Sequence, residues 1–199
     1  MADIGDGFDQ FFCNISCYTT KWLGLNSRLL LHNSFLYAVS VTLPHSISPI
    51  FNLMRALIQR VLEAKVVVEG QTTGEIQHGL LVFLGLGKSD TLEQGQKLID
   101  KILKYRIFDD EQGKMGWNLS QAQGGLLLVS QFTLMAQTQK GLRPDFGPAM
   151  PPAEAKALYE QLVEYARQQF AHVQTGIFAA DMKVHLINDG PVTFNLEIE

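Results

Sequence analysis

Residues 125–134 form an apolar run, and near its end lie four candidate catalytic residues, Ser130, Gln131, Phe132 and Thr133. Their hydroxyls, side-chain amide and backbone N–H groups could surround a carbonyl oxygen, and acyl transfer needs such donors where the oxyanion forms. If the whole run is one strand, Gln131 and Thr133 face one side and Ser130 and Phe132 the other. A strand end that simply emerges into solvent explains the same composition, so both interpretations stay open.

Ser130 or Thr133 could instead act as a nucleophile, which requires a positioned base. The histidines that could serve are His78, His172 and His185, and none lies in a recognisable triad pattern. Triad members meet in space and not in sequence, so the pattern does not exclude a triad. We expect each histidine to be structural or exposed.

The second unusual segment is residues 188–193, Asn-Asp-Gly-Pro-Val-Thr. It lies between two alternating runs, so its Asp-Gly pair predicts a hairpin turn. Pro191 would follow the turn into the next strand, where it has no N–H to donate to a ladder. The Gly190–Pro191 peptide bond is therefore a candidate for the cis form, and an unusual backbone at an exposed tip favours a functional role.

Two further segments have weaker signals. Residues 141–148 form a long loop with Arg143 and Phe146, which is either ordinary turn chemistry or a contact with phosphate and base. Residues 85–89, Gly-Leu-Gly-Lys-Ser, lack the spacing of a Walker A phosphate loop, so we interpret them as a strand-to-helix turn.

The elements that must position these segments follow from periodicity. Alternating or apolar runs predict strands at 56–62, 65–69, 79–87, 105–108, 125–134 and from 115 onward, with two or three more at the C-terminus. The residues Asp90-Thr91-Leu92-Glu93 resemble a capping box that starts one helix, and a second helix is predicted at about 152–170. About eight strands and two long helices predict an α+β fold, a mostly antiparallel sheet or barrel layered with the helices.

Composition sets the remaining bounds. The chain has 199 residues, 46% of them hydrophobic, and a net charge of −4, which argues against a broad basic face for duplex nucleic acid but leaves room for a local RNA contact. Residues 1–53 are expected to be a poorly structured extension before a domain at 54–199, with organelle targeting as the alternative. Their longest apolar run is too short to span a membrane. The two cysteines, Cys13 and Cys17, predict neither a disulfide scaffold nor a metal site, which fits a cytoplasmic protein.

From Met54 to the C-terminus the chain resembles the D-aminoacyl-tRNA deacylases, once called D-tyrosyl-tRNA deacylases. The two signature motifs of that family, SQxTL and NxGPxT, stand complete at residues 130–134 and 188–193. The segments 54–61 and 141–146 are also similar to the family. The resemblance covers about three quarters of the 199 residues, and the first 53 residues have no counterpart in the usual family pattern.

The resemblance implies a homodimeric hydrolase without metal or cofactor that cleaves the ester between a D-amino acid and tRNA. It implies that Gly190 and Pro191, supported by Asn188 and Thr193, enter the partner's active site and exclude L side chains. Glycyl-tRNA should then also be cleaved. For the chemistry we favour the backbone N–H groups near Phe132 and Thr133 with water or a ribose hydroxyl, against Thr133 as the nucleophile.

Two alternatives to an independent deacylase remain. The same fold occurs as an editing module of a synthetase, so the chain could act mainly as a tRNA-binding partner. A non-RNA esterase would hydrolyse small D-amino acid esters as efficiently as the tRNA ester.

Overall fold

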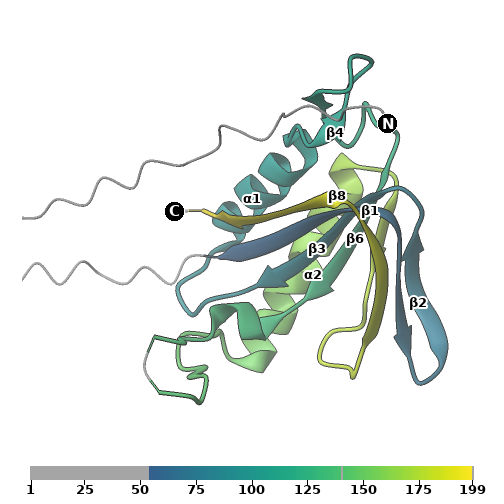
Figure 1. The fold of residues 1–199 in the computed structure, drawn as a ribbon. Coiled ribbons are helices and arrows are strands. Elements are labelled where there is room, and N and C mark those ends of the chain that lie inside the picture. Colours follow the sequence, from purple (N-terminus) through teal and green to yellow (C-terminus); the bar gives the residue numbers. More distant parts are fainter. Residues whose placement is uncertain (1–53, 140, 199) are drawn as a thin grey trace, which may run out of the picture. The chain divides into compact units, whose positions relative to one another are not determined.

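The computed structural model describes residues 54–139 and 141–198. The predicted N-terminal extension, Cys13 and Cys17 lie outside these ranges. The strands are β1 (Arg55–Val68), β2 (Gln71–Ile76), β3 (Gly79–Gly85), β4 (Phe108–Asp109), β5 (Met115–Trp117), β6 (Gly125–Ser130), β7 (Val173–Thr175) and β8 (Lys183–Glu197). The helices are α1 (Leu92–Lys104), α2 (Pro152–Gln169) and a short 3₁₀-helix, η1 (Phe132–Met135) (Figure 1).

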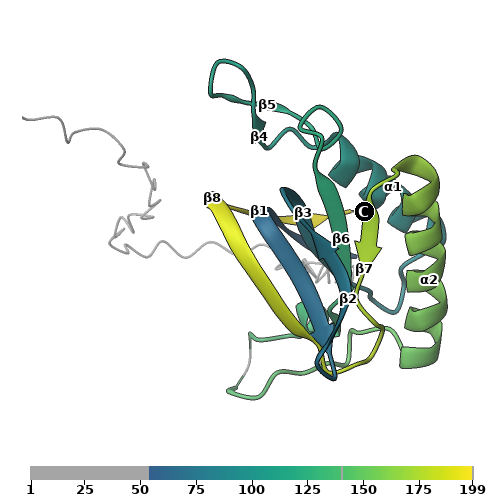
Figure 2. The same ribbon diagram turned by 90° about the vertical axis from the view of Figure 1, so that its right-hand side faces the viewer.

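Six strands form one sheet in the order β2-β1-β3-β6-β7, and β8 pairs with β1 along the other side. The pairs of β1 with β2, β3 and β8 are antiparallel, whereas β3, β6 and β7 run parallel. Helices α1 and α2 lie together on one side of this sheet (Figure 2). The predicted α+β fold, a mostly antiparallel sheet layered with two long helices, is confirmed.

Both faces of the central strands are buried, which is why residues 79–85 are almost wholly apolar. Successive side chains of a strand point to opposite faces. Leu80 and Val82 pack in the core beneath the helices with Leu98 of α1 and Leu162 of α2. Leu81 points the other way into a second core. That second core also contains the following residues: Val61, Ala64, Val66, Ile76, Leu127 and Val129.

The structure differs from the sequence prediction at β1, which is one strand of 14 residues and not two. At the expected break, residues 63–64, Glu63 is exposed and Ala64 is buried, and both remain in the strand. The reason is β8, which pairs with β1 from Arg55 to Val67 and so supports the backbone across the polar stretch. A long-range partner has overridden the local break in the pattern.

The helices agree with the prediction except at the first turn of α1. Its capping box is Thr91 with Gln94, one residue later than predicted: Gln94 N–H donates to Thr91 Oγ1 at 3.3 Å, and Thr91 N–H to Gln94 Oε1 at 2.9 Å. Asp90 does not cap the helix; its Oδ2 accepts instead from the Gly87 N–H at 2.5 Å. Within the described residues, no helix is long and apolar enough to cross a membrane.

Candidate active site

The predicted strand 125–134 ends early. β6 stops at Ser130, and residues Phe132–Met135 form η1, so the expected alternation of Gln131 and Thr133 against Phe132 is wrong. Gln131 N–H makes the last bond toward β3, to Leu84 O at 2.8 Å, and Gln131 O then accepts from Leu134 N–H at 3.2 Å. The chain therefore turns at Gln131 instead of continuing the ladder.

This turn brings the polar groups of the segment together. The Gln131 Nε2 amide donates to Thr133 Oγ1, so both side chains lie on one side of η1. The first N–H groups of a helix have no partner within it. In the described part of the chain, the N–H groups of Phe132 and Thr133 donate no hydrogen bond. Arg55 fixes the far end of η1, because its Nη1 donates to Leu134 O at 2.9 Å.

A cavity of about 750 Å³ opens beside η1. Ser130, Gln131 and Phe132 form part of its wall, and most of the remaining lining is apolar. Phe146, which the sequence singled out, also lines the cavity, and its ring lies 5.0 Å from that of Phe132, centroid to centroid. The second predicted RNA contact, Arg143, is exposed on the same loop and is not part of the lining.

The backbone at Gly190–Pro191 is not a hairpin. β8 pairs with β1 both before and after it, so the chain continues in one direction and the predicted turn is wrong. Between the pairs Gln59↔Thr193 and Val61↔Asn188, the four residues 189–192 of β8 face a single residue of β1. This is a large β-bulge, a device that re-aims a strand locally. The Gly190–Pro191 bond within it is cis, as expected, and both residues are exposed.

Asn188 and Thr193 close the bulge from within β8. Asn188 Oδ1 accepts from Val192 N–H at 2.8 Å, and its Nδ2 donates to Thr193 Oγ1 at 3.0 Å. Gly190 has φ +121°, which L side chains rarely adopt. Val192 is buried in the core beneath the helices. The bulge is therefore held at both ends while Gly190 and Pro191 face solvent.

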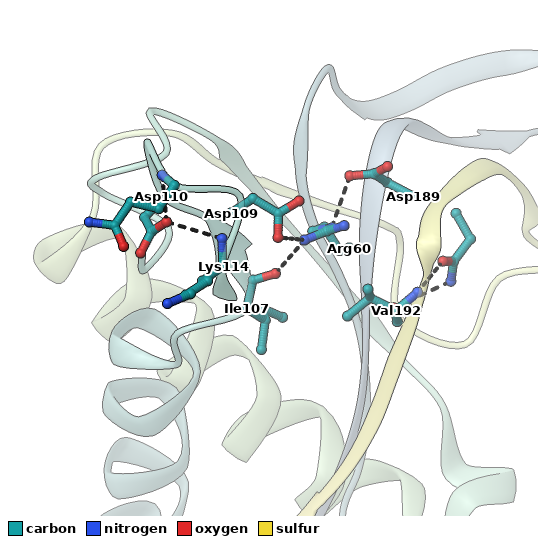
Figure 3. Close-up of polar contacts among 9 residues, drawn as sticks. Arg60, Ile107, Asp109, Asp110, Lys114, Asp189 and Val192 are labelled. Atoms are coloured by element: carbon teal, nitrogen blue, oxygen red, sulfur yellow. Dashed lines mark hydrogen bonds and ion pairs between the residues drawn. The ribbon is translucent and has the colours of Figure 1, made fainter. Parts of the chain in front are cut away.

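The single residue opposite the bulge is Arg60, which is 5% exposed. Its Nη1 donates to Ile107 O at 2.8 Å and lies 3.3 Å from Asp109 Oδ1. Its Nε forms an ion pair with Asp189 Oδ2 at 2.9 Å, without the alignment of a hydrogen bond (Figure 3). Our sequence reasoning missed Arg60. The signal that could have found it is the alternation of the strand, which places Arg60 on the same inward face of β1 as Ala56 and Ile58.

The two signature segments do not meet within one chain. No residue of 188–193 lines the cavity. The nearest lining residue along β8 is Val184, six residues before Gly190, or about 20 Å along the strand at about 3.3 Å per residue. The structure thus brings Ser130, Gln131, Phe132 and Phe146 together and leaves the Gly190–Pro191 bulge apart from them.

His78, His172 and His185 are exposed, as expected, and none of them lines this cavity. His78 packs its ring against Phe108, His172 packs against Phe170, and His185 lies on β8 opposite Lys65. The cavity lining within the described residues includes no histidine. Nor do the described residues contain three His, Cys, Asp or Glu side chains grouped as metal ligands.

The turn between β3 and α1 forms one rim of the cavity. Asp90 holds it, since its carboxylate accepts from Gly87 N–H and its own N–H donates to Gly87 O at 3.1 Å. Burial raises the pKa of Asp90 to about 6, against the opposing effect of bonds from the Gly87 and Met54 backbone. The sequence prediction of a strand-to-helix turn at residues 85–89 is confirmed.

The profile of the family described as D-Tyr-tRNA(Tyr) deacylase matches residues 57–197, nearly all of the described chain. The chain belongs to this family. The D-aminoacyl-tRNA deacylase of Acinetobacter baumannii (strain AYE) is 88% identical over 146 residues, which are 73% of this chain and 99% of that protein. The prediction of a hydrolase that acts on a carboxylic ester is confirmed by this membership.

Two solved structures share the fold of this family member. One, titled "c-Myc DNA Unwinding Element Binding Protein", is 40% identical, with a TM-score of 0.69 over 72% of this chain and 97% of that chain. The other, titled as a probable eukaryotic D-amino acid tRNA deacylase, has a TM-score of 0.66 over 73% of this chain and 99% of that chain. At 16% identity the second similarity concerns the fold alone.

Proposed function

We propose that this protein hydrolyses the ester bond of D-aminoacyl-tRNA and releases the D-amino acid and free tRNA. The observation that carries the proposal is the cavity beside η1, where the family motif residues Ser130, Gln131 and Phe132 form one wall. The high identity to a D-aminoacyl-tRNA deacylase agrees with it. A cytoplasmic location, where aminoacyl-tRNA is used, is part of the proposal.

The chemistry rests on the backbone of η1. The N–H groups of Phe132 and Thr133 point out of the first turn of this helix and are available to an oxyanion formed from the ester carbonyl. Each such donor contributes roughly 2.7–4 kcal/mol in other acyl-transfer sites. Water attacks the carbonyl carbon, and its proton passes to the ribose oxygen, either directly or through the neighbouring ribose hydroxyl as a relay. The ester C–O bond then breaks, the ribose oxygen leaves as a hydroxyl, and the D-amino acid keeps the oxygen from water.

Thr133 is poorly placed to be the nucleophile. Its Oγ1 accepts from the Gln131 amide, a neutral donor that does not remove a proton, and the cavity lining offers no histidine base in the described chain. We expect Thr133→Ala to retain most of the hydrolysis rate on D-tyrosyl-tRNA in single-turnover assays. Loss of activity in Thr133→Ala together with its retention in Thr133→Ser would make Thr133 the nucleophile.

The Gly190–Pro191 bulge would act on a second copy of the chain. It is exposed, it lies apart from its own cavity, and apolar side chains flank it: Leu62 is 52% exposed and Ile187 is 50% exposed. A homodimer would cover these side chains and bring the bulge of each subunit to the cavity of the other. Size-exclusion chromatography with light scattering should give twice the chain mass, and a monomer with full activity would exclude this arrangement.

A bulge that closes the cavity by its backbone would select by exclusion. An L side chain would collide with it, and a clash discriminates more strongly than an added methylene in a pocket, which is worth about 1–3 kcal/mol. A D side chain would point elsewhere, so selectivity among D-amino acids should be broad. Glycine has no side chain to exclude, and we expect glycyl-tRNA to be hydrolysed at enzyme concentrations that clear D-tyrosyl-tRNA.

The decisive experiment compares D- and L-tyrosyl-tRNA with the full chain and with a chain that begins at Met54. We expect rapid hydrolysis of the D ester, slow hydrolysis of the L ester and no effect of the first 53 residues. Equal rates on the two enantiomers would refute the chiral filter. No hydrolysis by the purified chain alone would favour the editing-module alternative, and efficient cleavage of small D-amino acid esters would favour a general esterase.

A further inference from the structure

We propose that Lys88 binds the phosphodiester that precedes the terminal nucleoside of the tRNA substrate. The inference rests on the proposed function. It adds a residue that distinguishes an aminoacyl-tRNA from an aminoacyl ester without a phosphate. Lys88 lies on the cavity wall, in the turn between β3 and α1.

The backbone holds Lys88 in a fixed place. Its N–H donates to Pro148 O at 3.1 Å, which ties the turn to the loop that follows Phe146. The preceding residue, Gly87, forms a β-bridge with Ala149, and its N–H donates to the Asp90 carboxylate. The Lys88 side chain therefore extends from a turn that is anchored to the loop of residues 146–150, which also lines the cavity.

Lys88 also supplies charge that the protein does not neutralise. The other charged residue of the lining is Asp181, and its carboxylate is already bound by Lys183 Nζ at 2.8 and 2.9 Å. Among the described residues Lys88 forms no salt bridge. The N-terminal end of α2, which carries partial positive charge, lies on the same cavity through Pro152. An anion is therefore the complementary ligand for this wall.

The other residues of the cavity wall indicate which part of the substrate lies near Lys88. Phe132 and Phe146 present aromatic surface, which suits a nucleoside, and the ester carbonyl must lie at η1 for the proposed chemistry. In a terminal nucleotide the ester is on the 2′ or 3′ oxygen and the phosphate is on the 5′ oxygen. A cation on the cavity wall but outside η1 matches the phosphate end of that nucleotide. Lysine serves phosphate as a compact point charge.

The test compares D-tyrosyl-tRNA with the 3′-D-tyrosyl ester of adenosine, which has no phosphate. We expect Lys88→Gln to raise the KM for the tRNA ester about tenfold, the loss of one charged hydrogen bond, with kcat unchanged. Hydrolysis of the adenosine ester should not change. The slope of log(kcat/KM) against log salt concentration should become shallower by about 0.7 for the tRNA ester. Lys88→Arg, which keeps the positive charge, should have a KM for the tRNA ester close to that of the wild type.

Lys97→Gln is the matched control, because Lys97 is an exposed lysine on α1 that pairs with Glu93 and does not line the cavity. As a second measurement, adenosine 5′-monophosphate should inhibit the wild type about tenfold more strongly than adenosine, and Lys88→Gln should abolish that difference. An unchanged KM in Lys88→Gln, equal losses on both esters, or equal inhibition of the wild type by adenosine and adenosine 5′-monophosphate would overturn the inference. If the wild type cleaves neither ester, the proposed function itself has failed.

Discussion

Arg60 is predicted to hold the Gly190–Pro191 bulge in place, and Arg60→Gln tests this directly. The guanidinium is buried and joins β1 to two segments that are far apart in sequence: Ile107 and Asp109 in one, and Asp189 in the other. Glutamine is shorter and uncharged, so it removes both ion pairs and keeps at most one of the hydrogen bonds. The bulge then loses its link to the β4–β5 hairpin behind it.

The magnitude follows from the exposure of each partner. The bond from Arg60 to the Ile107 carbonyl is buried and charge-assisted, and such bonds contribute about 1.5–3 kcal/mol. The side chains of Asp189 and Asp109 are 32% and 53% exposed, so solvent screens these pairs to about 1 kcal/mol or less each. Removing a buried charge also recovers its desolvation energy, which offsets the ion pairs. We expect a net loss of about 2 kcal/mol, or a fall in Tm of about 4–8 °C.

The assay needs two readouts because a stability loss alone does not show positioning. Urea denaturation measures the free energy of unfolding, and hydrolysis of D- and L-tyrosyl-tRNA measures the ratio that the bulge should control. We expect the D/L ratio of kcat/KM to fall in Arg60→Gln and to stay unchanged in Arg106→Gln, an exposed arginine on the same segment as Ile107. A less stable variant with an unchanged D/L ratio would refute the positioning role of Arg60.

Two further predictions concern groups buried away from the bulge. Burial raises the pKa of Asp90 from 3.8 to about 6, so between these pH values the folded protein binds a proton that the unfolded chain has released, and stability falls as pH rises from about 4 to 6. Asp90→Asn keeps an acceptor for the Gly87 N–H and should remove this fall in the free energy of unfolding, which is at most about 3 kcal/mol. Urea denaturation of the variant and the wild type at pH 4 and pH 7 measures it. A variant with the same pH profile as the wild type would contradict the burial argument. Tyr159 O–H donates to the buried Leu128 carbonyl at 2.9 Å, and Tyr159→Phe should destabilise the protein by about 0.5–1.5 kcal/mol in the same assay, a small effect because Gly176 N–H also donates to that carbonyl.

Local pattern was sufficient for the helices and the central strands. The apolar run at 79–85 and the proline at the start of α2 are signals whose physical cause lies within a few residues. The sequence also singled out residues 130–133 as candidates for chemistry, which stays a prediction. It could not show that they leave the strand at Gln131, because that turn depends on where β3 ends beside it.

The bulge is the feature that local pattern described wrongly. An Asp-Gly pair between alternating runs predicts a hairpin when only neighbouring residues are considered. The deciding partner is β1, whose Gln59 and Val61 pair with β8 on both sides of the segment and are more than 120 residues away along the chain. Arg60 was missed for the same reason, since its partners come from two other segments.

The difference between a hairpin tip and a bulge matters for selection by exclusion. A hairpin tip is attached at one end of a ladder and can bend away from a colliding side chain, whereas a bulge is held by ladder pairs on both sides. Asn188 bonds it across its own width, and Arg60 holds it from behind. A filter that works by clash requires a wall that does not yield, because every relaxation lowers the energy of the rejected substrate. The proposed selectivity therefore depends as much on these supports as on Gly190 and Pro191.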